Sequence, residues 1–178
     1  MAEMDIERFV EAPGRAEKIK QVREMIDSMG IEYLYLQVVS VTGKIMGKGI
    51  PSDHWESVAM KGFQLVYGAT VNLFTDRAGN YLGYGPEAAE LVGIPEPETF
   101  MQLPWAPKIG RFYCTLFRNR EEKTDPGAYL TADCRGNLRR MHEDFQAKHG
   151  RQLRIGTEPE MMWLKFDEDG KPKDGFSK

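Results

Sequence analysis

Two glutamates separated by one residue, Glu158 and Glu160, are the side chains in this sequence best suited to chemistry. A strand places alternate residues on opposite faces, so a β-strand over residues 153–163 would put both carboxylates on one face and mostly apolar residues on the other. Neighbouring like charges repel unless something neutralises them. Mg²⁺ prefers oxygen ligands and often carries substrate phosphates. The spacing therefore predicts either two ligands of a divalent metal ion or a solvated strand face.

Composition narrows the class of protein. The 178 residues are 41% hydrophobic and 29% charged, as in a globular protein of one domain or a small pair of domains. A net charge of −3 argues against a nucleic-acid-binding surface. No apolar run reaches the length of a membrane span, and the N-terminus lacks the apolar core of a signal peptide. We therefore expect no nucleic-acid partner and no membrane partner.

Two cysteines, Cys114 and Cys134, are too few for a disulfide framework and have no CxxC spacing. We expect them to be small buried apolar residues in a cytoplasmic protein.

The first half of the chain predicts a helix and a hairpin. Apolar residues at helical spacing indicate a helix over residues 15–29, followed by strands over 31–40 and 44–50 around a Thr-Gly-Lys turn. A short helix then begins after Pro51, with Asp53 and Glu56 at capping-box spacing.

The second half predicts a long loop, a strand and a helix. We expect a functional or disordered loop over residues 71–95 and a strand over 109–117. A helix over 133–148 has one apolar stripe, and its basic residues are interpreted as a solvated face. The stripe consists of Leu138, Met141 and Phe145, and the basic residues are Arg135, Arg139 and Arg140.

Two segments together resemble a known family. The stretch from Gly156 to Leu164 resembles the first metal-binding strand of the glutamine synthetase superfamily. The stretch from Asp133 to Arg140 resembles the Asp-Pro-Arg segment that starts the first helix of that family's catalytic domain, with Cys134 where proline is usual. The order of elements resembles the N-terminal portion of these enzymes over nearly the whole chain.

This resemblance implies an α+β fold, in which an N-terminal β-grasp domain precedes the beginning of a glutamine synthetase-type catalytic α/β domain. The expected division is an N-terminal extension over 1–14, the β-grasp domain over 15–125 and the start of the catalytic domain over 126–178. Because no helix or strand is expected after the last hairpin, we expect the chain to be a fragment of a longer protein.

The resemblance also implies an activity for the full-length protein: ATP-dependent amide formation between the γ-carboxyl of glutamate and an amine or ammonia, through a γ-glutamyl phosphate. It makes Glu158 and Glu160 ligands of the catalytic Mg²⁺ or Mn²⁺ ions. It further implies a ring-shaped homo-oligomer, with Tyr67 and the 71–95 loop near a subunit interface. The fragment alone is expected to be inactive.

Tyr67 marks a departure from the ammonia-using members. In these enzymes an aspartate of a Phe-Asp-Gly-Ser-Ser-like stretch binds ammonium, and the matching segment here is Val66-Tyr67-Gly68-Ala69-Thr70. A neutral phenol stabilises ammonium less than a carboxylate and is a poor base near neutral pH. Its ring suits the organic part of a larger amine. Tyr67 is therefore either an amine-site residue of a γ-glutamylamine ligase or a packing residue.

Three other functions remain open. The full-length protein could be a plain glutamine synthetase that uses ammonia. It could be a non-catalytic relative that serves as an assembly or regulatory module, although such a module has no reason to keep two adjacent like charges. A β-grasp-like binding domain unrelated to the synthetases is the third alternative.

Overall fold

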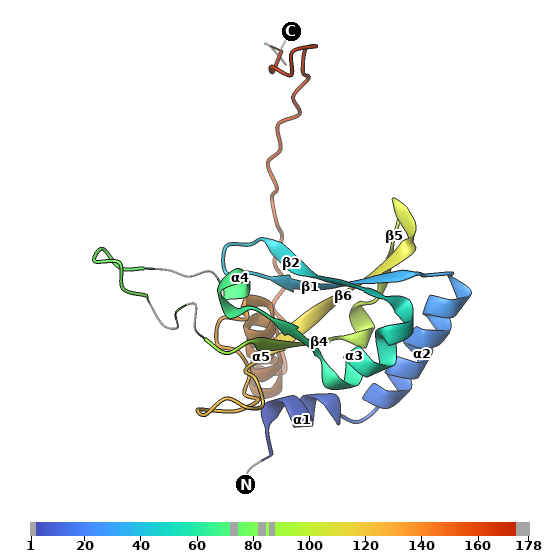
Figure 1. The fold of residues 1–178 in the computed structure, drawn as a ribbon, viewed down its shortest axis with the longest axis vertical. Coiled ribbons are helices and arrows are strands. Elements are labelled where there is room, and N and C mark those ends of the chain that lie inside the picture. Colours follow the sequence, from blue (N-terminus) through green and yellow to red (C-terminus); the bar gives the residue numbers. More distant parts are fainter. Residues whose placement is uncertain (1–2, 72–74, 82–84, 86–87, 174–178) are drawn as a thin grey trace.

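The computed structural model describes residues 3–71, 75–81, 85 and 88–173 of the chain. Figure 1 shows a twisted sheet with helices packed against it and a C-terminal segment that leads away from the body. The helices and strands in chain order are α1 (Asp5–Val10), α2 (Arg15–Ser28), β1 (Tyr33–Val39), β2 (Ile45–Pro51), the 3₁₀ helix η1 (Ser52–His54), α3 (Trp55–Lys61), β3 (Phe63–Leu65), α4 (Tyr67–Val71), β4 (Leu91–Pro95), the 3₁₀ helix η2 (Pro97–Thr99), β5 (Met101–Leu103), β6 (Ala106–Phe117) and α5 (Cys134–His149).

The sheet is mixed, with the order β2-β1-β6-β4-β3, and β5 pairs with β6. The predicted hairpin is confirmed, because β1 and β2 are antiparallel and pair Tyr33 with Pro51 and Val39 with Ile45. β1 and β6 run parallel at the centre of the sheet. The long β6 therefore connects the hairpin to β4 and β3.

One face of the sheet is covered by α2 and α3. Ile19, Val22 and Ile26 repeat at helical spacing along α2 and are buried against alternate residues of β1 and β6. From α3, the fully buried Trp55 stacks on Phe112 at 4.2 Å between ring centroids. Its indole N–H donates to the backbone carbonyl of Ile19 at 2.9 Å, which satisfies the one polar atom of the ring. This packing forms the main core.

A second, smaller core lies under α1. Ile6 and Val10 are buried against residues of β4 and against Phe117 at the end of β6. The backbone N–H of Ile6 also donates to the carbonyl of Gly127 at 2.9 Å. The region over 1–14, which we expected to be an extension, thus contains a helix that packs on the sheet.

Two local expectations were wrong. The loop expected over 71–95 is wrong at both ends, because Val71 ends α4 and residues 91–95 form the buried strand β4. Residues 72–74, 82–84 and 86–87 of the expected loop lie outside the described residues. Asp53 makes no capping hydrogen bond, since a 3₁₀ turn occupies residues 52–54 before α3 begins. Glu56 instead accepts from the guanidinium of Arg23 at 2.7 Å, which joins α3 to α2.

The sequence did not predict the short strands β3 and β5, because three residues carry too little periodicity to indicate a strand.

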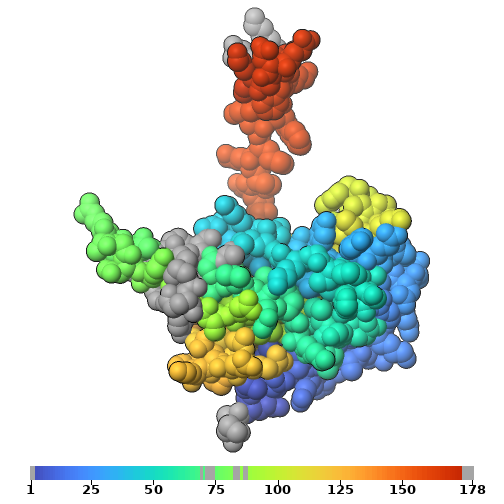
Figure 2. Space-filling model, in the orientation of Figure 1, coloured from blue at the N-terminus to red at the C-terminus, as the bar shows by residue number. Residues whose placement is uncertain are grey.

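The helix over 133–148 is confirmed as α5, and Asp133 caps it by accepting from the backbone N–H of Gly136 at 2.9 Å. The predicted strand over 153–163 has no strand partner among the described residues. That segment runs away from the body and ends in a small hairpin with a bridge between Phe166 and Pro172 (Figures 1 and 2). A strand is defined by its hydrogen-bonded ladder, so alternation of side chains alone does not make one.

Within the described helices, none combines the length and the apolar character that a membrane crossing requires.

Candidate functional site

Glu158 and Glu160 lie on the extended segment beyond α5, and both are exposed to solvent. Their apolar neighbours are exposed as well, with Ile155 at 81% and Trp163 at 78% of their maximum exposure. Among the described residues no group of three or more His, Cys, Asp or Glu side chains is arranged to hold a metal ion. Within the part of the chain that the structure describes, the pair therefore offers its carboxylates to a cation without a third His, Cys, Asp or Glu beside it.

The chemistry of this pair suits a divalent cation, although it completes only part of a ligand set. Mg²⁺ takes six oxygen ligands and commonly uses one or two carboxylates, with waters and substrate phosphates at the other positions. Glu158 and Glu160 could fill two such positions. Their role as metal ligands stays a prediction.

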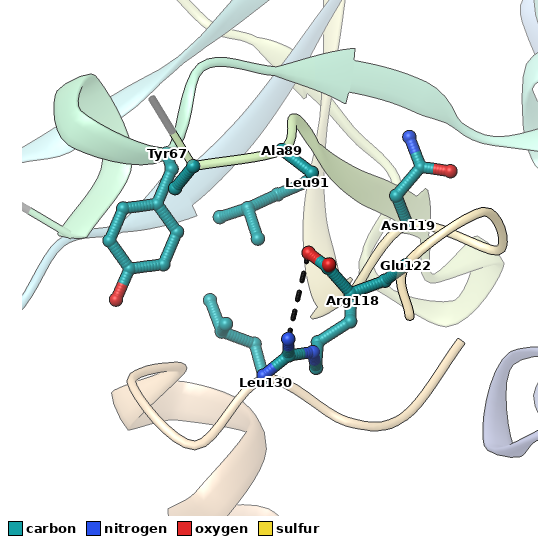
Figure 3. A pocket seen from close by; sticks show the side chains of 8 residues that line it. Tyr67, Ala89, Leu91, Arg118, Asn119, Glu122 and Leu130 are labelled. Carbon is teal, nitrogen blue, oxygen red and sulfur yellow. Dashed lines mark ion pairs between the residues drawn. The ribbon is translucent and has the colours of Figure 1, made fainter. Parts of the chain in front are cut away.

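Tyr67 is the first residue of α4 and lines a hollow between that helix, the start of β4 and the chain that follows β6 (Figure 3). The ring is half-buried, and in Figure 3 its hydroxyl points away from the charged side chains of the hollow. The apolar part of the lining comes from Leu91, Leu130 and two alanines, Ala88 and Ala89. Tyr67 therefore presents its ring, rather than its polar tip, to this space.

Two charged residues that we did not anticipate, Arg118 and Glu122, line the same hollow and form an ion pair at 3.5 Å. Their charges largely cancel, so the lining has little net charge of its own. The centre of a water molecule can occupy about 20 Å³ of the hollow, which corresponds to roughly one water. In this form the hollow could hold a small group beside the tyrosine ring but not a large amine. The i, i+4 spacing of Arg118 and Glu122 was visible in the sequence, but nothing there placed them beside Tyr67.

A buried acid, Glu96, was also missed. It follows β4 directly and is 1% exposed. Its carboxylate accepts from the Thr115 hydroxyl at 2.6 Å and pairs with Arg135 at 2.5 Å and Arg139 at 2.8 Å. The sequence did carry one signal for this site, because Glu96 directly follows an apolar run. An acid buried at such a place must be paired with a positive charge or a hydrogen-bond donor.

The interpretation of the α5 arginines as a solvated face was wrong. Arg135 and Arg139 face the sheet and neutralise Glu96, and Arg140 lies over the ring of Tyr129 at 4.1 Å from its centroid. Burial acts to lower the pKa of Arg135, but the hydrogen bond and charge of Glu96 outweigh burial and raise that pKa above its usual value. The buried carboxylate thus reverses the expected orientation of the helix.

The apolar stripe of α5 consequently faces away from the sheet. Leu138 is 64% exposed and Met141 69% exposed, and they line a shallow groove with Phe145, Leu153 and Ile155. Gly136 is the buried residue of α5. α5 thus turns its charged face toward the sheet and its apolar face outward, and polar contacts attach it to the sheet.

The two thiols differ. Cys114 is buried in the main core, as expected, and burial raises the pKa of its thiol well above the usual value. Cys134 is exposed at the start of α5, so the expectation that it is buried was wrong. Cys134 lies in the first turn of α5, where arginines rather than the cysteine face the sheet.

The chain is similar to bacterial glutamine synthetases. It is 24% identical over 163 residues to the glutamine synthetase of Staphylococcus aureus strain N315 and 25% identical over the same length to that of Staphylococcus epidermidis. Each alignment covers 90% of this chain and 33% of the relative. The chain therefore spans about a third of the length of the curated relatives it matches. No family model matches the sequence.

Solved structures agree on the fold. The chain superposes on GmaS in complex with ADP with a TM-score of 0.56 at 20% identity, over 71% of this chain and 26% of that one. It superposes on GmaS without ligand with a TM-score of 0.54 at 21% identity and the same coverage. The fold is thus the mixed α+β architecture of this part of a glutamine synthetase-type protein. The chain thus resembles proteins of the glutamine synthetase superfamily, in sequence over 90% of its length and in fold over 71%.

Proposed function

We propose that the protein containing this chain is an ATP-dependent ligase that joins an amine to the γ-carboxyl of glutamate. The observation that carries the proposal is the alignment with glutamine synthetases over 90% of the chain. A carboxylate is a poor electrophile, so its activation by phosphoryl transfer from ATP gives an acyl phosphate that the amine can attack. The products are the amide, ADP and inorganic phosphate.

In this proposal Glu158 and Glu160 hold a divalent ion, either Mg²⁺ or Mn²⁺. When bound, such an ion neutralises charge on the phosphates of ATP. The two carboxylates would hold and orient it. Their exposure on an extended segment is compatible with ligation, because both side chains are open to a cation and its waters.

We infer that residues 15–125 form a β-grasp domain and that residues 126–178 begin the catalytic domain. Support comes from the parallel pairing of β1 with β6 at the centre of a mixed sheet, with α2 across one face. The charged contacts between β4 and α5 lie where the two parts would meet.

We infer that the acceptor is a small organic amine, such as methylamine, and that Tyr67 belongs to the amine site. The support is the tyrosine where ammonia-using members carry aspartate, together with the apolar lining around its ring. An aromatic face attracts an alkylammonium ion by about 0.5–2 kcal/mol without rejecting its carbon atoms. By the same resemblance, we propose a cytoplasmic, ring-shaped homo-oligomer in which Tyr67 lies near a subunit interface.

The experiment is performed on the full-length parent protein. Phosphate release that depends on ATP and glutamate is measured with ammonia, methylamine, a polyamine and an aromatic amine. We expect turnover with at least one organic amine at about tenfold or more the efficiency with ammonia, equivalent to about 1.4 kcal/mol of transition-state discrimination. A Tyr67→Asp variant should shift the preference toward ammonia, and a Tyr67→Phe variant should keep the wild-type preference, because the ring carries the contact.

Efficient turnover with ammonia in the wild-type protein would identify a plain glutamine synthetase and make Tyr67 a packing residue. Absence of phosphate release with every amine, in a protein that still binds Mg²⁺, would favour the non-catalytic module instead.

A further inference from the structure

Glu96 is held rigidly on the sheet side. Its backbone N–H donates to the carbonyl of Tyr113 at 2.9 Å, and its own carbonyl accepts from the backbone N–H of Thr99 at 3.0 Å and from the Thr99 hydroxyl at 2.7 Å. The Thr115 hydroxyl on β6 fixes one carboxylate oxygen. The carboxylate is therefore a fixed point at the junction of β4 and β6.

The two oxygens of this carboxylate contact α5 at two positions. Arg135 contacts Oε1 and Arg139 contacts Oε2, and Arg139 also donates to the Thr115 hydroxyl at 3.1 Å. Arg135 and Arg139 are four residues apart, so they lie on one face of the helix about one turn apart. Contacts at both levels restrain the rotation of α5 about its axis and its tilt from the sheet.

A separate anchor holds the first turn of the helix. The carboxylate of Asp133 is buried and accepts from the backbone N–H of Leu116 on β6 at 2.9 Å, as well as from Gly136. The first turn is thus tied to β6, and Arg140 adds a contact with the ring of Tyr129. Because the apolar stripe of α5 faces away from the sheet, Glu96 supplies the restraint that apolar packing usually provides.

We propose that Glu96 is a positioning residue: it clamps α5 through Arg135 and Arg139, and so sets the direction in which the chain leaves this helix toward Glu158 and Glu160. Its catalytic consequence rests on the function proposed above. The clamp on α5 does not depend on that function, because all of its contacts lie within this chain.

The first test measures amide hydrogen exchange in the 178-residue chain. A Glu96→Gln variant keeps the size of the side chain but leaves two arginines opposite a neutral amide. We expect amides within residues 137–148 to exchange at least about tenfold faster, while amides of β1 and β6 change by less than about twofold. A Glu98→Gln variant is the matched control, because it removes the same charge from an exposed residue of the same turn and should leave α5 unchanged.

A second variant guards against misfolding of the first. Arg139→Lys keeps the positive charge but cannot contact both Glu96 and Thr115 with a planar fork, and it should loosen α5 in the same direction by a smaller factor. Unchanged exchange in α5 for both variants would overturn the clamp. Equal acceleration throughout the sheet would also overturn it, because it would show a general loss of stability.

The last measurement links the clamp to the site, using the full-length parent protein. We expect Glu96→Gln to raise the Mg²⁺ concentration for half-maximal activity and to lower kcat, each by about tenfold, with the KM for the amine within about twofold. Glu98→Gln should match the wild type. Glu96→Asp, which restores the charge, should recover part of the loss. An unchanged Mg²⁺ requirement in Glu96→Gln would overturn the positioning role.

The failure of the proposed function is a separate outcome. If the wild-type parent releases no phosphate with any amine, that function fails and the positioning role toward catalysis fails with it. The exchange experiment still decides the clamp, because it needs no activity.

Discussion

At the scale of single residues, burial separates side chains that the sequence makes look alike. Cys114 on β6 is 2% exposed in the main core, whereas Cys134 is open to solvent. The thiolate is the reactive form of cysteine, and both access and ionisation control its formation. The two thiols should therefore differ strongly in reactivity.

Alkylation of the native chain should modify Cys134 and spare Cys114. We expect one equivalent of iodoacetamide to react at least about a hundredfold faster than the second at pH 8, because the Cys114 thiol is both enclosed and held protonated. Mass spectrometry of tryptic peptides locates the label. A Cys134→Ala variant that still reacts at the fast rate would contradict this assignment.

Burial of Cys114 also has a consequence for stability at alkaline pH. Desolvation raises its pKa in the folded state, and the charge of Glu96 acts in the same direction. The unfolded thiol ionises near its reference pKa of about 8.5 while the folded one stays protonated, so the unfolded state binds fewer protons above that pH. The contribution is fully present below about pH 8.5 and is lost as pH rises.

We therefore expect the free energy of unfolding to fall above about pH 8.5, with Cys114 contributing up to about 1.4 kcal/mol per pH unit. Urea titrations between about pH 7.5 and 9.5 measure the slope. A Cys114→Ala variant will be less stable at every pH because it leaves a cavity, but its slope should be shallower. Identical slopes in the two proteins would refute this account.

At the scale of elements, α5 shows how a buried charge decides which face of a helix turns inward. An apolar stripe normally faces the core because burial of apolar area is favourable. Here Glu96 lies beneath the helix, and an unpaired buried carboxylate would cost several kcal/mol. The arginines therefore face the sheet, and Leu138 and Met141 face outward.

The N-terminus of α5 should be far more sensitive to mutation than that of α3. Replacement of Asp133 by Ala removes the helix cap and leaves the backbone N–H of Leu116 without its acceptor. We expect a loss of about 2–4 kcal/mol, combining about 1 kcal/mol for the cap with about 1–3 for the unsatisfied donor. Urea denaturation measures it.

Asp53→Ala is the matched control, because Asp53 makes no capping hydrogen bond. It should change stability by less than about 0.5 kcal/mol, as exposed substitutions usually do. Similar losses for the two variants would show that the Asp133 contacts are not the cause.

At the scale of the whole molecule, the structure divides into a packed sheet with its helices and an extended segment beyond α5. Figure 2 shows the segment beyond α5 extending from the body. The packed part contains both cores, while Leu153, Ile155 and Trp163 are each more than half exposed. Backbone without a ladder or packing opens at almost no free-energy cost.

Limited proteolysis should report this division. Trypsin is expected to cut after Arg151 or Arg154 before it cuts in the sheet, and to leave a product that ends near residue 151 or 154 with its secondary structure retained. Mass spectrometry of the early products identifies the site. An Arg151→Gln, Arg154→Gln double variant provides the control, because it should lose the early product. Early cleavage within β1 or β6 would contradict the division.

The local pattern of residues in the sequence was sufficient to predict several elements of this protein. The period of apolar residues correctly predicted α2, the β1–β2 hairpin, β6 and α5 as elements. In α2 the apolar residues face the sheet, whereas in α5 the same period gave the helix but not the face that turns inward. The motifs around Asp133 and Glu158 were also sufficient to indicate the superfamily, which the comparisons bear out. The metal role of Glu158 and Glu160 stays a prediction.

Tertiary structure alone decided which side chains meet. The contacts of Glu96 with Arg135 and Arg139 span 39 and 43 positions of sequence, and the hollow brings Tyr67 beside Arg118 and Glu122 from another part of the chain. No local period records such contacts. Burial turns Glu96 from an ordinary acid into the partner that orients a helix, because a charge removed from water must be paired where it lies.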